Sequence, residues 1–184
     1  MEVKVKSNMK EAMRNLRNVP RKYIQKALVT SLNKIGAEVF TQAKRELKDA
    51  TGLKVGVVAK GLKKDKARKG DETYSIHIKS RYLNAIEFGA RQTKKGVSAK
   101  IWGKRKIYRG AFIGGGRNSG KRLVFRQHED DPKKAVALHG ASLPREFHRQ
   151  DMAKIFNKKT KNRFPILFKR ALEFHLLKAK GRIG

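Results

Sequence analysis

The clearest hydrophobic pattern of the chain lies between residues 20 and 48. Apolar side chains recur there every three or four residues, which places them on one face of a helix. They are Ile24, Leu28, Leu32, Ile35, Val39, Ala43 and Leu47. Pro20 suits the first turn of such a helix, and Gly52 provides a stop soon after its end. The pattern predicts a long amphipathic helix that packs its apolar face into a core.

A similar spacing predicts a second helix that begins at Pro165, a residue suited to a first helical turn. Its apolar face consists of Leu167, Ala171, Phe174 and Leu177, widened by Phe168, Leu172 and Leu176. Because this apolar arc is wide, we expect the helix to pack on a neighbouring subunit as well as on its own core.

Alternation of apolar and polar residues predicts several short strands. One is a strand or ordered arm at residues 3–5, and another covers residues 74–78, with His77 turned away from the core. Further strand signals, separated by glycine-bearing turns, occur at residues 97–102, 106–113 and 123–126. Together they predict an antiparallel sheet packed against the long N-terminal helix and the C-terminal helix, an α+β fold.

The remaining segments have weaker patterns. Residues 53–64 suggest a second, shorter helix, and residues 63–70 a solvated basic loop. An acidic turn at residues 129–132 precedes apolar positions that are spaced as in a helix. We therefore expect one domain of residues 1–184, in which residues 129–162 form a helical insertion or interaction lobe.

Charge narrows the range of partners. The chain has 47 Lys and Arg against 15 Asp and Glu, a formal net charge of +32. Residues 88–128 contain twelve of these cations and no Asp or Glu. Nucleic acid, acidic protein and anionic membrane surfaces are the generic partners of such a charge. The absence of a signal-like start and of any run of eighteen apolar residues favours a soluble, intracellular product without a membrane partner.

Patterns that would indicate an enzyme are incomplete. Residues 115–121 have the glycine and lysine spacing of a P-loop, but Arg122 replaces the metal-binding hydroxyl residue. A strand signal follows, whereas a P-loop opens a helix. The glycines are better explained as a hairpin tip.

A metal-dependent nuclease would need converging carboxylates, and the dense acidic group is residues 129–131. Its histidine neighbours His128, His139 and His148 have no recognised ligand spacing, so a solvated turn explains the group better. With no cysteine and no nucleophile-elbow serine, we expect a protein without catalytic activity, cofactor or metal.

Nonspecific nucleic-acid binding remains open. The acid-free segment mixes its cations with Trp102, Tyr108, Phe112 and Phe125, and cations beside stackable rings are typical of such surfaces. No helix-turn-helix, zinc-finger or RNP-type signature is present. The alternative, that the rings belong to a sheet core and the lysines are solvated, is equally compatible with the sequence.

Particular residues of the acid-free segment resemble a known family. Residues 90–98, Ala-Arg-Gln-Thr-Lys-Lys-Gly-Val-Ser, and residues 110–113, Gly-Ala-Phe-Ile, are similar to the central signature of the minor tail protein Z family of tailed phages and prophages. Leu-Val-Phe-Arg at residues 123–126 and Arg-Phe-Pro-Ile at residues 163–166 are similar to later elements of that family. The resemblance covers most of the chain.

The resemblance implies a virion structural protein, made in the host cytoplasm, that completes the tail and prepares its head-proximal end for joining to the capsid. It implies a ring-forming homo-oligomer, often a hexamer, that contacts tail terminator, connector or tube proteins. The positive charge of its loops suits either acidic faces of these proteins or packaged DNA, and the sequence leaves both open. The residues expected to make these contacts are Arg91, Gln92, Thr93, Lys94, Lys95, Lys104, Arg105, Lys106, Arg109, Phe112, Arg117, Lys121 and Arg122.

Overall fold

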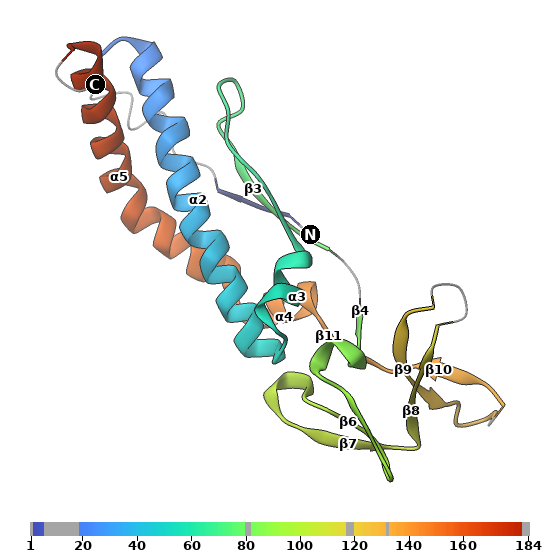
Figure 1. Cartoon of the computed structure of the whole chain (residues 1–184). Coiled ribbons are helices and arrows are strands. Elements are labelled where there is room, and N and C mark those ends of the chain that lie inside the picture. The colour runs from blue at the N-terminus through green and yellow to red at the C-terminus, as the bar shows by residue number, and fades with distance from the viewer. Residues whose placement is uncertain (1, 6–18, 80–81, 117–119, 132, 182–184) are drawn as a thin grey trace. The chain divides into compact units, whose positions relative to one another are not determined.

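The chain has an α+β fold, as its sequence pattern predicts (Figure 1). The structure is a computed structural model that describes residues 2–5, 19–79, 82–116, 120–131 and 133–181. Its helices are α2 (Arg21–Thr51), α3 (Val55–Lys60), α4 (Leu143–Arg149) and α5 (Met152–Ala179), with short 3-10 turns η1 (Ala85–Phe88) and η2 (Ile101–Gly103). Its strands are β1 (Glu2–Val5), β2 (Leu62–Asp65), β3 (Tyr74–Ile78), β4 (Tyr82–Asn84), β5 (Arg91–Thr93), β6 (Gly96–Ala99), β7 (Lys106–Arg109), β8 (Ala111–Gly115), β9 (Arg122–Gln127), β10 (Ala135–Ala137) and β11 (His139–Ser142).

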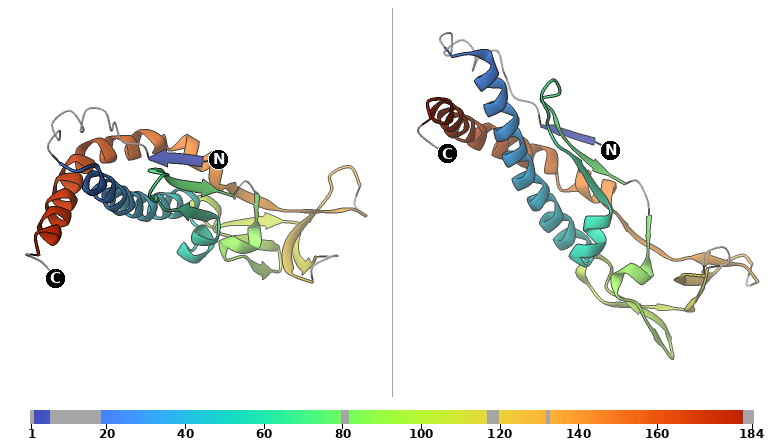
Figure 2. Two further views of the ribbon diagram at one scale, coloured as in Figure 1. Left: turned by 90° about the horizontal axis from the view of Figure 1, so that it is seen from above. Right: turned by 45° about the horizontal axis from the view of Figure 1, so that its top comes forward.

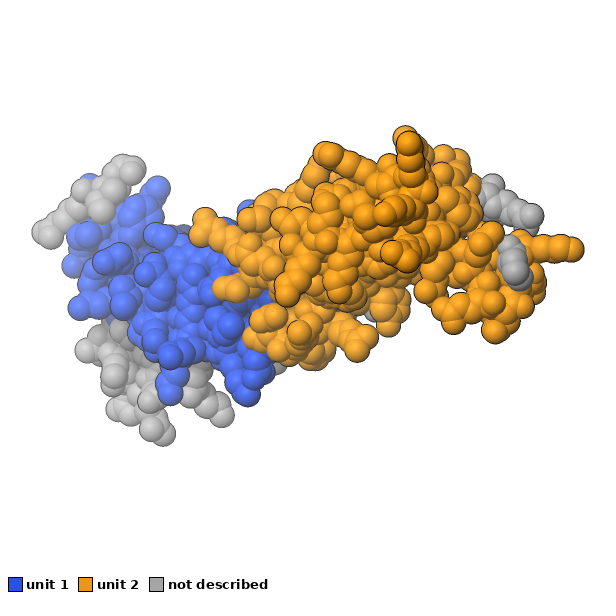
Figure 3. Space-filling model, turned by 90° about the horizontal axis from the view of Figure 1, so that it is seen from below, with its two compact units in different colours: residues 1–43, 63–77, 151–184 blue, residues 44–62, 78–150 orange. Residues whose placement is uncertain are grey.

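The strands form small antiparallel sheets rather than the single sheet that the sequence predicts. Their strand orders are β1-β3-β2, β11-β4, β5-β6-β7 and β10-β9-β8. The chain also divides into two compact units, coloured in Figure 3. Unit 1 consists of residues 1–43, 63–77 and 151–184, and unit 2 of residues 44–62 and 78–150. The expectation of a single domain with a lobe at residues 129–162 stays a prediction.

In unit 1, α2 and α5 lie side by side and run antiparallel (Figures 1 and 2). Near the start of α2, Thr30 Oγ1 lies 3.1 Å from His175 Nε2. Further along α2, Glu38 Oε1 accepts a hydrogen bond from Arg163 Nη2 at 3.0 Å, and Glu38 Oε2 forms an ion pair with Arg163 Nε at 2.9 Å. The apolar stripe of α2 that the sequence predicts is buried, which confirms this helix. The two helices contribute to the core of unit 1 Ile24, Ala27, Leu28, Leu32, Ile35, Val39, Ala43, Met152, Phe156, Leu167, Phe168, Ala171 and Leu172.

Two residues of α2 connect this helix to the β2–β3 hairpin. The Asn33 side chain donates to the Ala67 carbonyl and accepts from the Ala67 amide, both at 3.0 Å. One turn later, Gly36 leaves room for the Tyr74 ring, because a Cβ at Gly36 would lie 2.3 Å from Tyr74 Cγ. The absence of a side chain at residue 36 therefore permits close contact between helix and strand.

The predicted strand at residues 74–78 is confirmed as β3, the centre of its sheet. The predicted strand at residues 3–5 is confirmed as β1, which pairs antiparallel with β3 so that Val3 is opposite Ile76. His77 is half-buried and its Nε2 lies 2.8 Å from Asp65 Oδ2 on β2. This partner explains His77 without a catalytic role.

The C-terminal helix does not begin at Pro165, as the pattern predicts, but at Met152. Pro165 lies in the interior of α5, where it can donate no backbone hydrogen bond and its ring crowds the preceding turn. The helix bends between its orange and its red half in the left view of Figure 2. Buried Met152 and Phe156 before the proline, and Leu167 after it, fix both halves by packing. Tertiary contacts therefore override the proline signal.

In unit 2, buried Asn84 joins two sheets. Its amide nitrogen donates to the Val124 carbonyl at 3.0 Å, and its oxygen accepts from the amides of Val124 at 2.8 Å and Ile86 at 3.0 Å. The apolar core of unit 2 consists of Leu47, Leu53, Val58, Leu62, Ile78, Leu83, Ala85, Phe88, Val97, Ala99, Ile101, Ala111, Val124, Ala141, Leu143 and Phe147.

Several predicted boundaries in the middle of the chain are wrong. The short helix is limited to α3, and residues 62–65 of the predicted helix and basic loop form β2, which pairs beside β3. The strand predicted at residues 97–102 ends at Ala99, and the one at 106–113 is split because Gly110 adopts φ +69°. Within the expected helical insertion, Ala135–Ala137 and His139–Ser142 form β10 and β11, and α4 begins at Leu143.

Candidate interaction surface

The acid-free segment folds into two small sheets of unit 2. β5, β6 and β7 form an antiparallel meander in which Val97 is opposite both Gln92 and Tyr108. β8 and β9 form the next hairpin, with Phe112 opposite Phe125. The residues that the sequence predicts as an interaction site are therefore divided between these two sheets.

Lys94 and Lys95 occupy the tip of the β5–β6 hairpin, between the paired residues Thr93 and Gly96. Both lysines are exposed. Gly96 has φ +134°, and a Cβ there would lie 2.2 Å from the Tyr108 carbonyl oxygen. Because only glycine fits this position, the tight return of the chain presents the two lysines to solvent.

Gln92 and Thr93 make hydrogen bonds within the protein. Gln92 Oε1 accepts from the Ile113 amide at 2.9 Å, and Gln92 Nε2 donates to the Gly96 carbonyl at 3.2 Å. Thr93 Oγ1 donates to the same carbonyl at 2.9 Å. Gln92 thus connects the β5–β6 hairpin to β8, which gives this residue of the family-like segment a structural role.

Arg105 also has internal partners. Its Nη1 donates to Ser98 Oγ at 3.2 Å and lies 3.5 Å from the Gly89 carbonyl oxygen. Gly89 adopts φ +65°, so its carbonyl is part of a turn. The guanidinium fastens the start of β7 to β6 and to this turn.

The other predicted cations are exposed. In the part of the chain that the structure describes, none of the following pairs with a carboxylate: Arg91, Lys94, Lys95, Lys104, Lys106, Arg109 and Arg122. Lys121 is also exposed, and it interacts with another group of the chain. Arg117 lies outside the described residues. Exposed cations without counter-charges create a positive potential that attracts anionic surfaces.

The predicted hairpin is confirmed by the pairing of β8 with β9, and residues 117–119 at its tip lie outside the described residues. The Gly116 amide donates to the Lys121 carbonyl at 2.9 Å, and Gly115 is paired with Arg122. β9 follows this tip, where a P-loop would open a helix. The glycine-rich sequence is therefore a strand connection.

The aromatic residues of the segment have different environments. Phe112 is 39% exposed, but one face of its ring stacks on Phe125, with ring centroids 5.8 Å apart. Tyr108 is half-buried, and burial raises the pKa of its phenol. Tyr108, Phe112 and Phe125 therefore belong at least in part to the sheets.

Trp102 is a surface aromatic that the predicted site did not include. It is 50% exposed, has φ +53°, and its Nε1 donates to Oε1 of buried Glu146 at 3.3 Å. The adjacent Gly103 approaches Gly52 closely, because a Cβ at Gly52 would lie 2.4 Å from the Gly103 nitrogen. In the sequence, Trp102 is noticeable as a single tryptophan before a glycine in a stretch without Asp or Glu. Its hydrogen bond to Glu146 cannot be predicted from the sequence.

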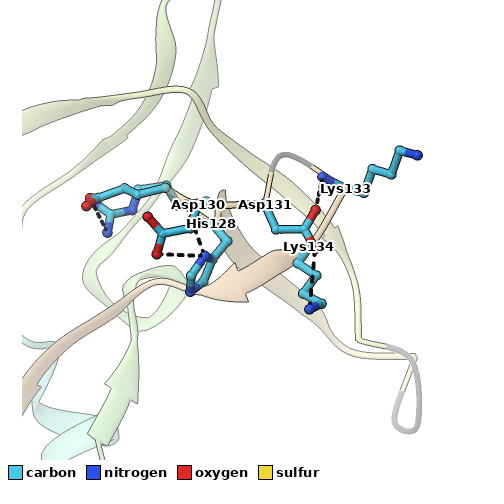
Figure 4. Close-up of polar contacts among 7 residues, drawn as sticks. His128, Asp130, Asp131, Lys133 and Lys134 are labelled. Carbon is cyan, nitrogen blue, oxygen red and sulfur yellow. Dashed lines mark hydrogen bonds and ion pairs between the residues drawn. The ribbon is translucent and has the colours of Figure 1, made fainter.

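The acidic turn has nearby basic partners rather than a metal-site arrangement (Figure 4). Asp131 Oδ2 lies 3.3 Å from Lys134 Nζ, and Asp130 Oδ2 lies 3.8 Å from His128 Nδ1. Glu129 pairs with Arg126 at 3.2 Å. Within the described residues, no group of three or more His, Cys, Asp or Glu is placed to hold a metal ion.

No helix in the described ranges combines the length and the hydropathy that a membrane crossing requires.

Comparison with known proteins identifies the family. The family model described as prophage minor tail protein Z (GPZ) matches residues 6–180. No curated protein and no solved structure matches. Because the match spans nearly the whole 184-residue chain, the chain belongs to the prophage minor tail protein Z family and is a minor tail protein of a phage or prophage.

Proposed function

We propose that this prophage minor tail protein completes the tail and joins it to the head, as a nonenzymatic subunit of a ring at the head-proximal end. The family supports a place in the virion and contacts with other phage structural proteins. The observation that carries the proposal further is the set of exposed cations on β5 to β7 that have no carboxylate partner among the described residues. A homo-oligomeric ring, with six subunits as the arrangement to test, would repeat this surface around the tail axis.

The lysine-bearing hairpin tip gives this surface a mechanism. Lys94 and Lys95 are held by a glycine-dependent turn, whose flanking Gln92 is fastened to β8. A tip with two exposed cations can engage acidic faces of terminator, connector or tube proteins, or the phosphates of packaged DNA. Such charge complementarity mainly accelerates encounter and fixes register.

The gene itself provides the first test. Deleting it in the phage should leave heads and tails that do not join, visible as separate particles by electron microscopy. A normal yield of joined particles would reject the proposal.

Charge reversal at the tip tests the surface itself. Lys94→Glu combined with Lys95→Glu should reduce particle assembly while the purified protein keeps its thermal stability. Lys133→Glu combined with Lys134→Glu is the matched control. These two lysines are also adjacent and exposed, but they lie next to the carboxylate of Asp131 and therefore already have a counter-charge. Equal assembly defects in both double variants would contradict a specific role for the β5–β6 tip.

A nonspecific nucleic-acid-binding role is the second candidate, favoured by the same exposed cations, which have no carboxylate partner among the described residues, and by the partly exposed ring of Phe112. Duplex DNA binding that falls steeply with salt would support phosphate contacts. Absence of binding even at low salt would remove this candidate, and it would leave the tail-joining proposal intact.

A further inference from the structure

Unit 1 contains a cavity of about 250 Å³ that the tail-joining proposal does not use. α2 supplies Lys22, Lys26 and Thr30 to its wall. Lys69, from the loop between β2 and β3, and His175, from α5, also line it. Three separate elements therefore bring cationic and hydrogen-bonding groups to one cavity.

The cavity has an excess of positive charge. Among the described residues, its lining contains three lysines and no carboxylate. In the described part of the chain, Lys26 and Lys69 form no ion pair, and Lys22 Nζ lies 5.0 Å from the centre of the Tyr23 ring. Lysines that line one cavity without a counter-charge repel one another, and an anion bound in the cavity would relieve this repulsion.

The polar groups of the lining suit an anion that accepts several hydrogen bonds. Thr30 Oγ1 and His175 Nε2 lie 3.1 Å apart, and Gln25 adds an amide. We propose that this cavity binds a phosphate group, either as free phosphate or as part of a nucleic-acid backbone. A phosphate has enough oxygens and charge to engage lysines from both α2 and the β2–β3 loop, whereas one carboxylate offers two oxygens and a single charge.

The pKa of His175 depends on the electrostatic potential inside the cavity. Burial, together with the charges of Lys26 and Lys178, lowers the pKa of His175. Lys22 and Lys69 line the same cavity, and positive charge near an imidazole disfavours its protonated form. A phosphate among them would favour the imidazolium, and its binding should therefore raise the pKa of His175.

This change can be measured in the purified full chain by NMR titration of the histidine rings. The titration is run in sodium phosphate and in sodium chloride of equal ionic strength. Phosphate should raise the pKa of His175 and the melting temperature more than chloride does, since a ligand that binds only the folded state stabilises it. An identical effect of the two salts would overturn the proposal, because screening alone would then explain it.

Lysine variants test whether the response belongs to the cavity. Lys69→Gln, on an exposed loop, should fold normally and weaken phosphate binding about two- to fivefold, the range of a solvent-exposed ion pair. Lys133→Gln removes an equal charge in unit 2 and should leave phosphate binding unchanged. Equal weakening in both variants would overturn the site.

A short DNA duplex separates the two sources of phosphate. A His175 response to inorganic phosphate alone supports a site for the free anion, and a response to the duplex supports a backbone contact. If neither ligand changes the His175 titration, the cavity does not bind phosphate. Since these measurements use isolated protein, their failure is independent of any defect in tail joining.

Discussion

Replacing Gly36 with alanine tests the contact between the long helix and the central strand of unit 1. A Cβ at this position would lie 2.3 Å from Tyr74 Cγ and 2.5 Å from each Cδ. Ordinary carbon contacts are about 3.5–4.0 Å, so the methyl group would enter the face of the ring. Tyr74 is 1% exposed on the central strand of its sheet, which leaves the ring little room to move.

Two opposing effects determine how much Gly36→Ala changes the free energy of unfolding. Alanine is favoured over glycine in a helix by about 1 kcal/mol. Overpacking a filled core costs about 1–3 kcal/mol, and a clash this short belongs at the upper end. We expect Gly36→Ala to lower the free energy of unfolding by about 1–2 kcal/mol, which corresponds to a melting temperature about 2–8 °C lower for a chain of this size.

Urea unfolding followed by circular dichroism measures this change, with Gly56→Ala as the matched control. Gly56 is exposed in α3, and a Cβ there meets nothing within 4 Å. The control should therefore be neutral or stabilising. Tyr74→Leu removes the ring, and in that background Gly36→Ala should cost less. A Gly36→Ala protein as stable as the wild type, or purely additive costs in the double variant, would refute the reasoning.

Three further predictions concern polar contacts. Glu38→Gln should lower the free energy of unfolding by about 1 kcal/mol at low salt and by less at high salt, because Glu38 is partly exposed and binds Arg163 through a hydrogen bond and an ion pair; salt-independent urea midpoints would contradict this. Because burial, Lys26 and Lys178 lower the pKa of His175, the unfolded chain binds the proton more tightly, so wild-type stability should fall as the pH drops below about 6.5. His175→Gln should flatten that part of the pH profile, and identical profiles would reject the assignment. Gln92→Ala should speed hydrogen exchange at the Ile113 amide, whereas Gln92→Glu should keep it protected by retaining the acceptor oxygen.

Local patterns in the sequence were sufficient where one face of an element is buried. The stripe from Ile24 to Leu47 predicts α2, and the alternation around Ile76 predicts β3, because each periodicity matches a buried face. Residues 91–93 lack such alternation, so β5 was not predicted as a strand. Its stability comes from pairing with β6 and from the bond between Gln92 and Ile113.

Contacts between distant residues could not be predicted from single-sequence patterns. A glycine such as Gly36 lowers the stability of a helix, so local propensity does not explain it. Only the position of the Tyr74 ring shows why a residue without a side chain is needed there. Pro165 predicts the start of a helix. The helix nevertheless begins earlier, at Met152, because Met152 and Phe156 pack into the core. The cavity beside His175 likewise combines residues from three elements, and their sequence spacing carries no sign of it.

The acid-free segment contains two kinds of polar residue, although its sequence makes them look alike. Gln92 and Arg105 are used in hydrogen bonds that hold strands and turns together, so their loss should first affect folding. Lys94 and Lys95 project from a hairpin tip and pair with no carboxylate of the described chain. Removing their charge should reduce self-repulsion in a protein of net charge +32, and hence should not destabilise it. If their charge is nevertheless required for particle assembly, the requirement must come from an anionic partner.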